Sequence, residues 1–166
     1  MNTRSSTSAT SEPDPASPWA RRLAEWLGRP LAALWAGGLW TIGYVVAPTL
    51  FARLDDRHLA GEIAGWLFER VAQLGLACGL ILIGLALAME GRRAVRARAF
   101  WVVVAMLILA LIQWQWLQPW MREIKAAGEV TASAFGRLHA ISSVLYLIQS
   151  ILALPMLTAA TGRRAC

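Results

Sequence analysis

Charged residues are scarce in this sequence of 166 residues, and they are kept apart from the apolar ones. They make up 16% of the chain, whereas soluble globular proteins carry about 25%. Asp, Glu, Lys and Arg are entirely missing from four long stretches, residues 30–52, 71–89, 99–121 and 138–162. Such a chain lacks the surface charge that a water-soluble fold needs.

Catalytic motifs are missing as well. The sequence has no GxSxG, no HExxH and no Gly-rich phosphate loop, so we expect neither an enzyme nor a cofactor. The two cysteines, Cys78 and Cys166, form no CxxC pair, and we expect no disulfide framework. The absence of Asp, Glu, Lys and Arg from the four stretches weakens the interpretation as a transporter driven by an ion gradient.

The four uncharged stretches have the length of membrane spans. Each is 19 to 25 residues long, and a bilayer core of about 30 Å needs about 20 helical residues. Backbone groups within lipid must bond internally, which makes helices the expected structure. The sequence therefore predicts an all-α fold, an integral membrane four-helix bundle with spans over about 31–51, 71–89, 99–120 and 138–161.

The flanking segments suggest a simple organisation around one membrane domain, residues 29–162. Residues 1–18 are rich in Ser, Thr and Pro and predict a disordered cytoplasmic tail. Residues 19–28 place Trp19, Leu23 and Trp26 on one face, which favours a short interfacial helix. Residues 58–70 predict a helical run-in to the second span, and the third loop predicts a helical turn broken at Gly128.

The distribution of basic residues predicts the orientation. The N-terminus, the second loop and the C-terminus share one side, with 10 basic and 4 acidic residues, and the other side has 6 of each. The positive-inside rule then places both termini in the cytoplasm. The abundance of Arg and Ala suggests a bacterial source, so we expect a multi-pass protein of the bacterial inner (plasma) membrane. The net charge of +6 is an orientation signal, and no nucleic acid is expected.

Uncharged polar residues gather in one half of the predicted bilayer. In the fourth span six of them recur at helical spacing and form one face, about 16 Å long: His139, Ser142, Ser143, Tyr146, Gln149 and Ser150. Polar residues of the first and third spans lie at the same depth. We predict a polar vestibule open to the outside, formed by Tyr44, Pro48, Gln115, Gln118, His139, Ser142, Ser143, Tyr146 and Gln149.

Two interpretations of these polar residues stay open. Polar side chains in a span are costly unless they face the bundle or water, and they often mark functional sites. Ser, Gln and Tyr also bond across helices without further function, at about 0.6 kcal/mol each. Metal binding by His58 and His139 is a further hypothesis, because both lie on the outer side near acidic residues. Haem ligation is disfavoured because His58 lies outside the spans.

Four strings resemble the transmembrane protein 205-like family. They are LWAGGLW, VVAPTLF (45–51), AGEIAGWLF (60–68) and FGRLHAISSVLYL (135–147). The similarity covers about residues 31–160 and implies a four-span membrane protein carrying a domain of unknown function. Its signature positions would be Pro48, Phe51, Gly61, Gly65, Phe68, His139 and Ser142. Members often have Asn near the position of Tyr146, and this chain departs from that pattern.

Three hypotheses for function follow. The first is a binding or scaffold protein of the inner membrane that uses the polar vestibule. The second is a small transporter or channel component for a metal ion or a small polar solute. The third is a membrane enzyme or redox subunit. The expected partners are the lipid bilayer and either a second copy of the chain or another membrane protein.

Overall fold

The computed structural model describes residues 18–126 and 132–161, and this part of the chain is helical almost throughout. Gly128 and most of the predicted N-terminal tail lie outside the described residues. The elements in order are α1 (Pro18–Trp40), the π-helical η1 (Thr41–Val46), α2 (Ala47–Arg53), α3 (Arg57–Glu90), the 3-10 helix η2 (Gly91–Arg96), α4 (Arg98–Ile112), the π-helical η3 (Gln113–Leu117), α5 (Gln118–Ala126) and α6 (Ala132–Thr161).

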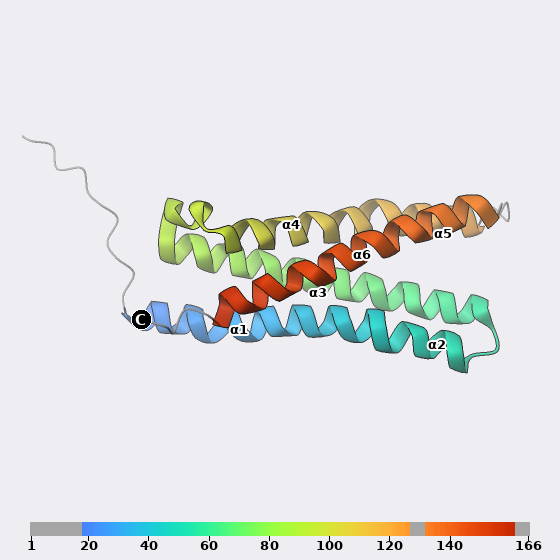
Figure 1. Cartoon of the computed structure of the whole chain (residues 1–166), viewed down its shortest axis with the longest axis horizontal. Helices are drawn as coiled ribbons and strands as arrows, with labels where there is room; N and C mark the ends of the chain where they lie inside the picture. The colour runs from blue at the N-terminus through green and yellow to red at the C-terminus, as the bar shows by residue number, and fades with distance from the viewer. Residues whose placement is uncertain (1–17, 127–131, 162–166) are drawn as a thin grey trace, which may run out of the picture.

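These elements form four rods. α1, η1 and α2 make the first, α3 the second, α4, η3 and α5 the third, and α6 the fourth (Figure 1). α3 packs against both α1 and α4, and α6 crosses the other face of these two helices. The η2 connection and the C-terminal end of α6 lie at the same end of the bundle as the start of α1, which is called the terminal end below. The α2–α3 connection and α5 lie at the opposite end, called the far end.

Local chemistry sets the turns between the rods. At the far end Asp56 caps α3, because its Oδ1 accepts from the backbone N–H of His58 at 2.8 Å and of Leu59 at 3.2 Å. At the terminal end α3 stops at Gly91, whose φ of 54° suits a residue without a Cβ. Trp101 then ties η2 to α4 by donating from Nε1 to the carbonyl of Val95.

Within the described residues, four helices are long and apolar enough to cross a membrane: Trp26–Arg53, Arg57–Arg96, Arg98–Met121 and Gly136–Ala159. The predicted spans fall on these four helices, and the all-α prediction is confirmed. Together with the arrangement of the rods, they indicate a multi-pass membrane protein.

One predicted boundary differs in the structure. Residues 19–28 do not form a separate short helix, because α1 runs from Pro18 through Pro30 to Trp40 without a break. Proline within a helix removes one N–H donor, yet α1 continues past Pro30. The helical run-in predicted over residues 58–70 agrees with the structure, where these residues lead into the second span within α3.

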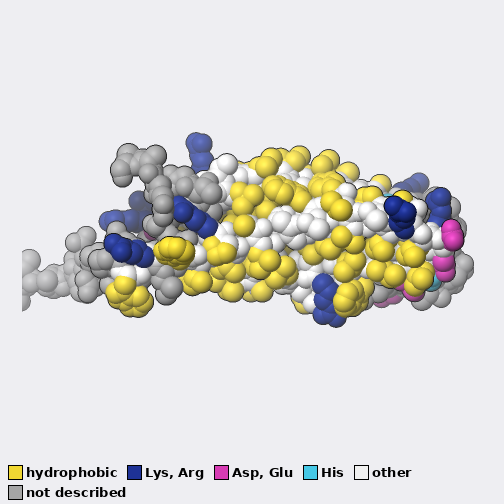
Figure 2. Space-filling model, turned by 90° about the horizontal axis from the view of Figure 1, so that it is seen from below, with side chains coloured by type: hydrophobic (Ala, Val, Ile, Leu, Met, Phe, Trp, Pro, Cys, Tyr) yellow, Lys and Arg dark blue, Asp and Glu magenta, His cyan; other side chains and the backbone are white. Residues whose placement is uncertain are grey.

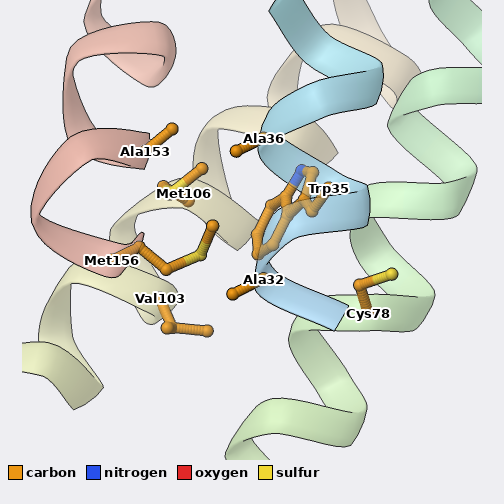
Figure 3. Packing of buried hydrophobic residues seen from close by; sticks show 8 residues of the cluster. All are labelled: Ala32, Trp35, Ala36, Cys78, Val103, Met106, Ala153 and Met156. Atoms are coloured by element: carbon orange, nitrogen blue, oxygen red, sulfur yellow. The ribbon is translucent and has the colours of Figure 1, made fainter. Parts of the chain in front are cut away.

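The indole of Trp35 occupies the centre of the bundle and is 1% exposed. Side chains from all four rods surround it, among them Cys78 of α3, Met106 of α4 and Met156 of α6 (Figure 3). Gly75 and Gly79 of α3 make room for this ring, since a Cβ added at either would overlap it. The GxxxG step that these two glycines form on α3 therefore admits a large side chain.

The two π-helical segments each end two residues before a proline. η1 ends at Val46 before Pro48, and η3 ends at Leu117 before Pro119. A proline ring clashes with the carbonyl four residues earlier, and the wider π turn gives that carbonyl room. Pro30 and Pro155 lie in regular α-helix, so proline alone does not explain the wide turns.

On the face seen in Figure 2, most side chains along the middle of the bundle are hydrophobic, and most charged side chains lie toward its two ends. Many large hydrophobic side chains are exposed there, including Leu80, Ile108, Val144, Ile151 and Leu154. Acidic side chains appear on the far end in this view. An exposed apolar girdle of this extent is typical of a surface that faces lipid.

Candidate functional site

The polar stripe of α6 is defined as His139, Ser142, Ser143, Tyr146, Gln149 and Ser150. It runs from the far end of the bundle toward its centre. His139 and Ser143 are exposed, Ser142 and Tyr146 are half-buried, and Gln149 and Ser150 are buried. The stripe therefore starts at the surface and ends inside the protein.

The buried end of the stripe is satisfied by hydrogen bonds to α4 and η3. Gln149 accepts from Nε2 of Gln113 at 2.9 Å and donates from its own Nε2 to the carbonyl of Met106 at 3.3 Å. Both glutamines are less than one-tenth exposed. Ser150 donates to the carbonyl of Tyr146 one turn earlier, and its carbonyl accepts from Nε1 of Trp40.

Tyr146 links α6 to the first rod beside its π-helical segment. Its hydroxyl donates to the carbonyl of Leu39, two residues before η1 begins. Its ring lies edge-on to those of Tyr44 and Phe68, with centroid distances of 6.4 and 5.1 Å. Gly43 within η1 is required here, because an added Cβ would overlap the Tyr146 ring.

Tyr146 and Gln149, one helical turn apart on α6, thus reach two different rods, each close to its π-helical segment. Single π turns are frequent at functional sites. The sequence left two interpretations open for Tyr146 and Gln149, a vestibule or hydrogen bonds between helices. In the structure both residues make hydrogen bonds to other helices.

The other predicted vestibule residues are spread over the surface of the far half. Tyr44, Pro48 and Gln115 are exposed, and Gln118 is half-buried against Gly65 of α3. Ser143 donates to the carbonyl of His139 within α6. Phe68, a signature position of the resemblance, meets Tyr146.

The two histidines are exposed and sit on different helices. His58, on the first turn of α3, has Nδ1 3.9 Å from Oε1 of Glu62. His139 lies near the start of α6. Among the described residues, no group of three or more His, Cys, Asp and Glu is placed to hold a metal ion. The geometry of this part of the chain adds no support to the metal hypothesis.

Two of the hollows on the surface of the described residues were not predicted from the sequence. The larger, about 550 Å³, is a groove between α3 and α4 lined by Gln73, Leu76, Ala77, Leu80, Leu107, Ile108, Leu111 and Trp114. The smaller, about 360 Å³, lies at η3 beside Leu111, Ile112, Gln115 and Trp116. Of the predicted vestibule residues, only Gln115 lines either of these two hollows.

Sequence reasoning also missed two polar contacts between helices. Gln113 is the hydrogen-bond partner of Gln149. It lies 7 residues after Met106 and 3 after Ala110, so its helical spacing places it on the same buried face as these two residues of α4. Glu69 of α3 is half-buried and accepts from Nε1 of Trp114 at 3.4 Å. Glu69 lies in the charged first turns of α3, and nothing in the sequence predicts its contact with Trp114 of the third rod.

Comparison with known proteins shows the family. A family model described as a domain of unknown function (DUF4149) matches residues 31–130, more than half of the chain. The chain belongs to this family. The match runs from Leu31 within α1 through the second and third rods, including both π-helical segments, and it supplies no activity. No curated protein and no solved structure matches the chain.

Proposed function

We propose that this DUF4149 chain is an integral membrane protein of the bacterial inner membrane and acts as a binding or scaffold protein. In this proposal both termini lie in the cytoplasm, and the binding region lies in the far half of the bundle. The resemblance to the transmembrane protein 205-like family belongs to the same proposal.

Tryptophan side chains support a membrane location. Trp19, Trp26 and Trp101 are exposed toward the terminal end, and Trp66, Trp116 and Trp120 are exposed toward the far end. Tryptophan is enriched at both membrane–water interfaces, where its ring spans apolar and wet surroundings. Two such belts with an apolar surface between them are the pattern of a bilayer-spanning bundle.

Charge supports the orientation. The η2 connection and the start of α4, at the terminal end, carry Arg92, Arg93, Arg96 and Arg98. The α2–α3 connection and the first turns of α3, at the far end, carry Asp55, Asp56 and Glu62 beside their basic residues. Short loops rich in arginine stay in the cytoplasm, which favours cytoplasmic termini.

The single observation that carries the binding proposal is the gradient of exposure along the polar stripe. His139 and Ser143 offer polar groups at the surface, while Gln149 holds the deep end in place by bonds to Gln113 and Met106. Tyr44 and Gln115 add exposed polar groups on the neighbouring rods. A ligand or a partner helix approaching the far half would meet hydrogen-bonding groups on a rigid frame, which suits recognition.

Site-specific photocrosslinking in native membranes tests this proposal. A benzophenone amino acid replaces Ser143 in one variant and Leu154 in the other. Both positions are exposed and lie 11 residues apart on nearly the same face of α6. We expect a discrete crosslinked product at position 143 that is absent at position 154. Equal products at both positions, or none at 143, would contradict a binding region in the far half.

A further inference from the structure

The groove between α3 and α4 lies outside the proposed binding region on α6. It is formed by two facing rows, each repeating at helical spacing: Gln73, Leu76, Ala77 and Leu80 on α3, and Leu107, Ile108, Leu111 and Trp114 on the third rod. From Leu76 to Leu80 and from Leu107 to Leu111 the lining is wholly apolar. The volume of about 550 Å³ is within the range of ligand sites.

Polarity is confined to one end of the groove, toward the far end of the bundle. Gln73 lines this end, and its Oε1 accepts from Nη1 of Arg70 at 2.9 Å. The exposed guanidinium of Arg70 lies 5.3 Å from the ring centroid of Trp66. The neighbouring carboxylate of Glu69 accepts from Trp114. Arg70 therefore presents a cation at the lip of the groove, held by an amide and an aromatic ring.

The depth of this lip agrees with a membrane interface. Trp66, on the turn of α3 before Arg70, and Trp116, beside the groove residue Trp114, are both exposed. Exposed tryptophans of this kind settle at the level of lipid headgroups. With the lip at headgroup level, the apolar rows run from the interface into the hydrocarbon.

A cation at the interface beside an apolar groove complements an anionic phospholipid. The cation can bind the phosphate, and the groove can hold an acyl chain. Basic side chains near a membrane surface attract anionic headgroups. A helix of a second copy packed along the groove would instead remove the Arg70 guanidinium from water, which is costly for a charged group.

We propose that this groove binds one anionic phospholipid, with an acyl chain along the apolar rows and the phosphate at Arg70. The site does not depend on the α6 stripe. It rests on the proposed membrane location, and its failure would leave the proposed binding region on α6 untouched.

Native mass spectrometry of the full chain, with added dioleoyl phosphatidylglycerol or dioleoyl phosphatidylcholine, tests the site. Arg70→Gln removes the cation and keeps a polar side chain, and Arg57→Gln is its control because Arg57 is exposed near the same end of α3. Ala77→Phe fills the groove from an exposed position, and Ala33→Phe makes the same change at an exposed position of α1. Circular dichroism checks that each variant is folded.

We expect the wild type to bind phosphatidylglycerol in preference to phosphatidylcholine. Arg70→Gln should weaken phosphatidylglycerol binding about five-fold, the effect of one basic residue near an anionic surface. Ala77→Phe should weaken binding of both lipids, and the two controls should leave it unchanged. Equal binding of the two lipids, or unchanged binding in Ala77→Phe, would overturn the proposal. A dimer that Ala77→Phe dissociates, without any change in lipid binding, would assign the groove to a second copy.

Discussion

Gln113 and Gln149 bond to each other in the interior of the bundle, with 2.9 Å between Nε2 of the first and Oε1 of the second. They come from the third rod and from α6, 36 residues apart in sequence. Gln149 also bonds to the carbonyl of Met106. A buried amide pair of this kind fixes the register of two helices because each partner satisfies the other.

Replacing Gln149 by Leu should destabilise the bundle by about 1 kcal/mol, since it leaves the buried amide of Gln113 without this partner. The double variant Gln113→Leu/Gln149→Leu should lose less than the sum of the two single changes. Reversible unfolding in mixed detergent micelles measures both, with Gln115→Leu as the exposed control. Strict additivity of the two single changes would show that the pair does not interact.

Gly75→Ala should be among the most damaging small substitutions, at about 1–3 kcal/mol, because the new methyl group overlaps the buried Trp35 ring. Gly84→Ala on the same helix has open space around its Cβ and should cost nothing. The unfolding midpoints of the two variants make the comparison. Similar losses at both positions would mean that α3 does not pack on Trp35 as described.

Tyr146→Phe keeps the ring that packs on Phe68 and removes only the hydroxyl that donates to the carbonyl of Leu39. The expected loss is about 1 kcal/mol, the net value of one hydrogen bond. Tyr44→Phe, at an exposed position, is the matched control and should have no effect. Hydrogen exchange of the amides in η1 should rise in the first variant and stay unchanged in the second.

Added Zn²⁺ should not stabilise the protein through His139. The described residues place no group of three or more His, Cys, Asp and Glu for a metal ion, and two exposed histidines on separate helices make a poor site. Thermal unfolding with and without the ion, in the wild type and in His139→Ala, measures this. A zinc-dependent rise in Tm that His139→Ala abolishes would restore the metal hypothesis.

The number, type and order of the long helices could be predicted because each is marked by an uncharged stretch of spanning length. Helix ends were harder to predict. Residues 58–70 are helical as predicted and run into the second span within α3. Residues 19–28 are instead part of α1, because charged residues continue a helix readily once it leaves hydrocarbon.

The site could be predicted only in part. The helical spacing of the polar residues identified the stripe on α6, but spacing on one helix does not show which residues on other helices it meets. Gln113 as the partner of Gln149, and the carbonyl of Leu39 as the acceptor for Tyr146, follow from how α6 crosses α1 and α4. Proline in the sequence did not reveal the π-helical segments, because Pro30 and Pro155 lie in regular α-helix.

The most direct measurement is cysteine labelling in intact cells with a membrane-impermeant maleimide, on a background with Cys78 and Cys166 replaced by Ala. A single cysteine is placed at the exposed Asp55, at the far end, or at the exposed Arg93 in η2. A four-span bundle with cytoplasmic termini predicts labelling at position 55 in intact cells and at position 93 only after permeabilisation. Labelling at position 93 in intact cells, or recovery of the chain in the soluble fraction without detergent, would contradict the account.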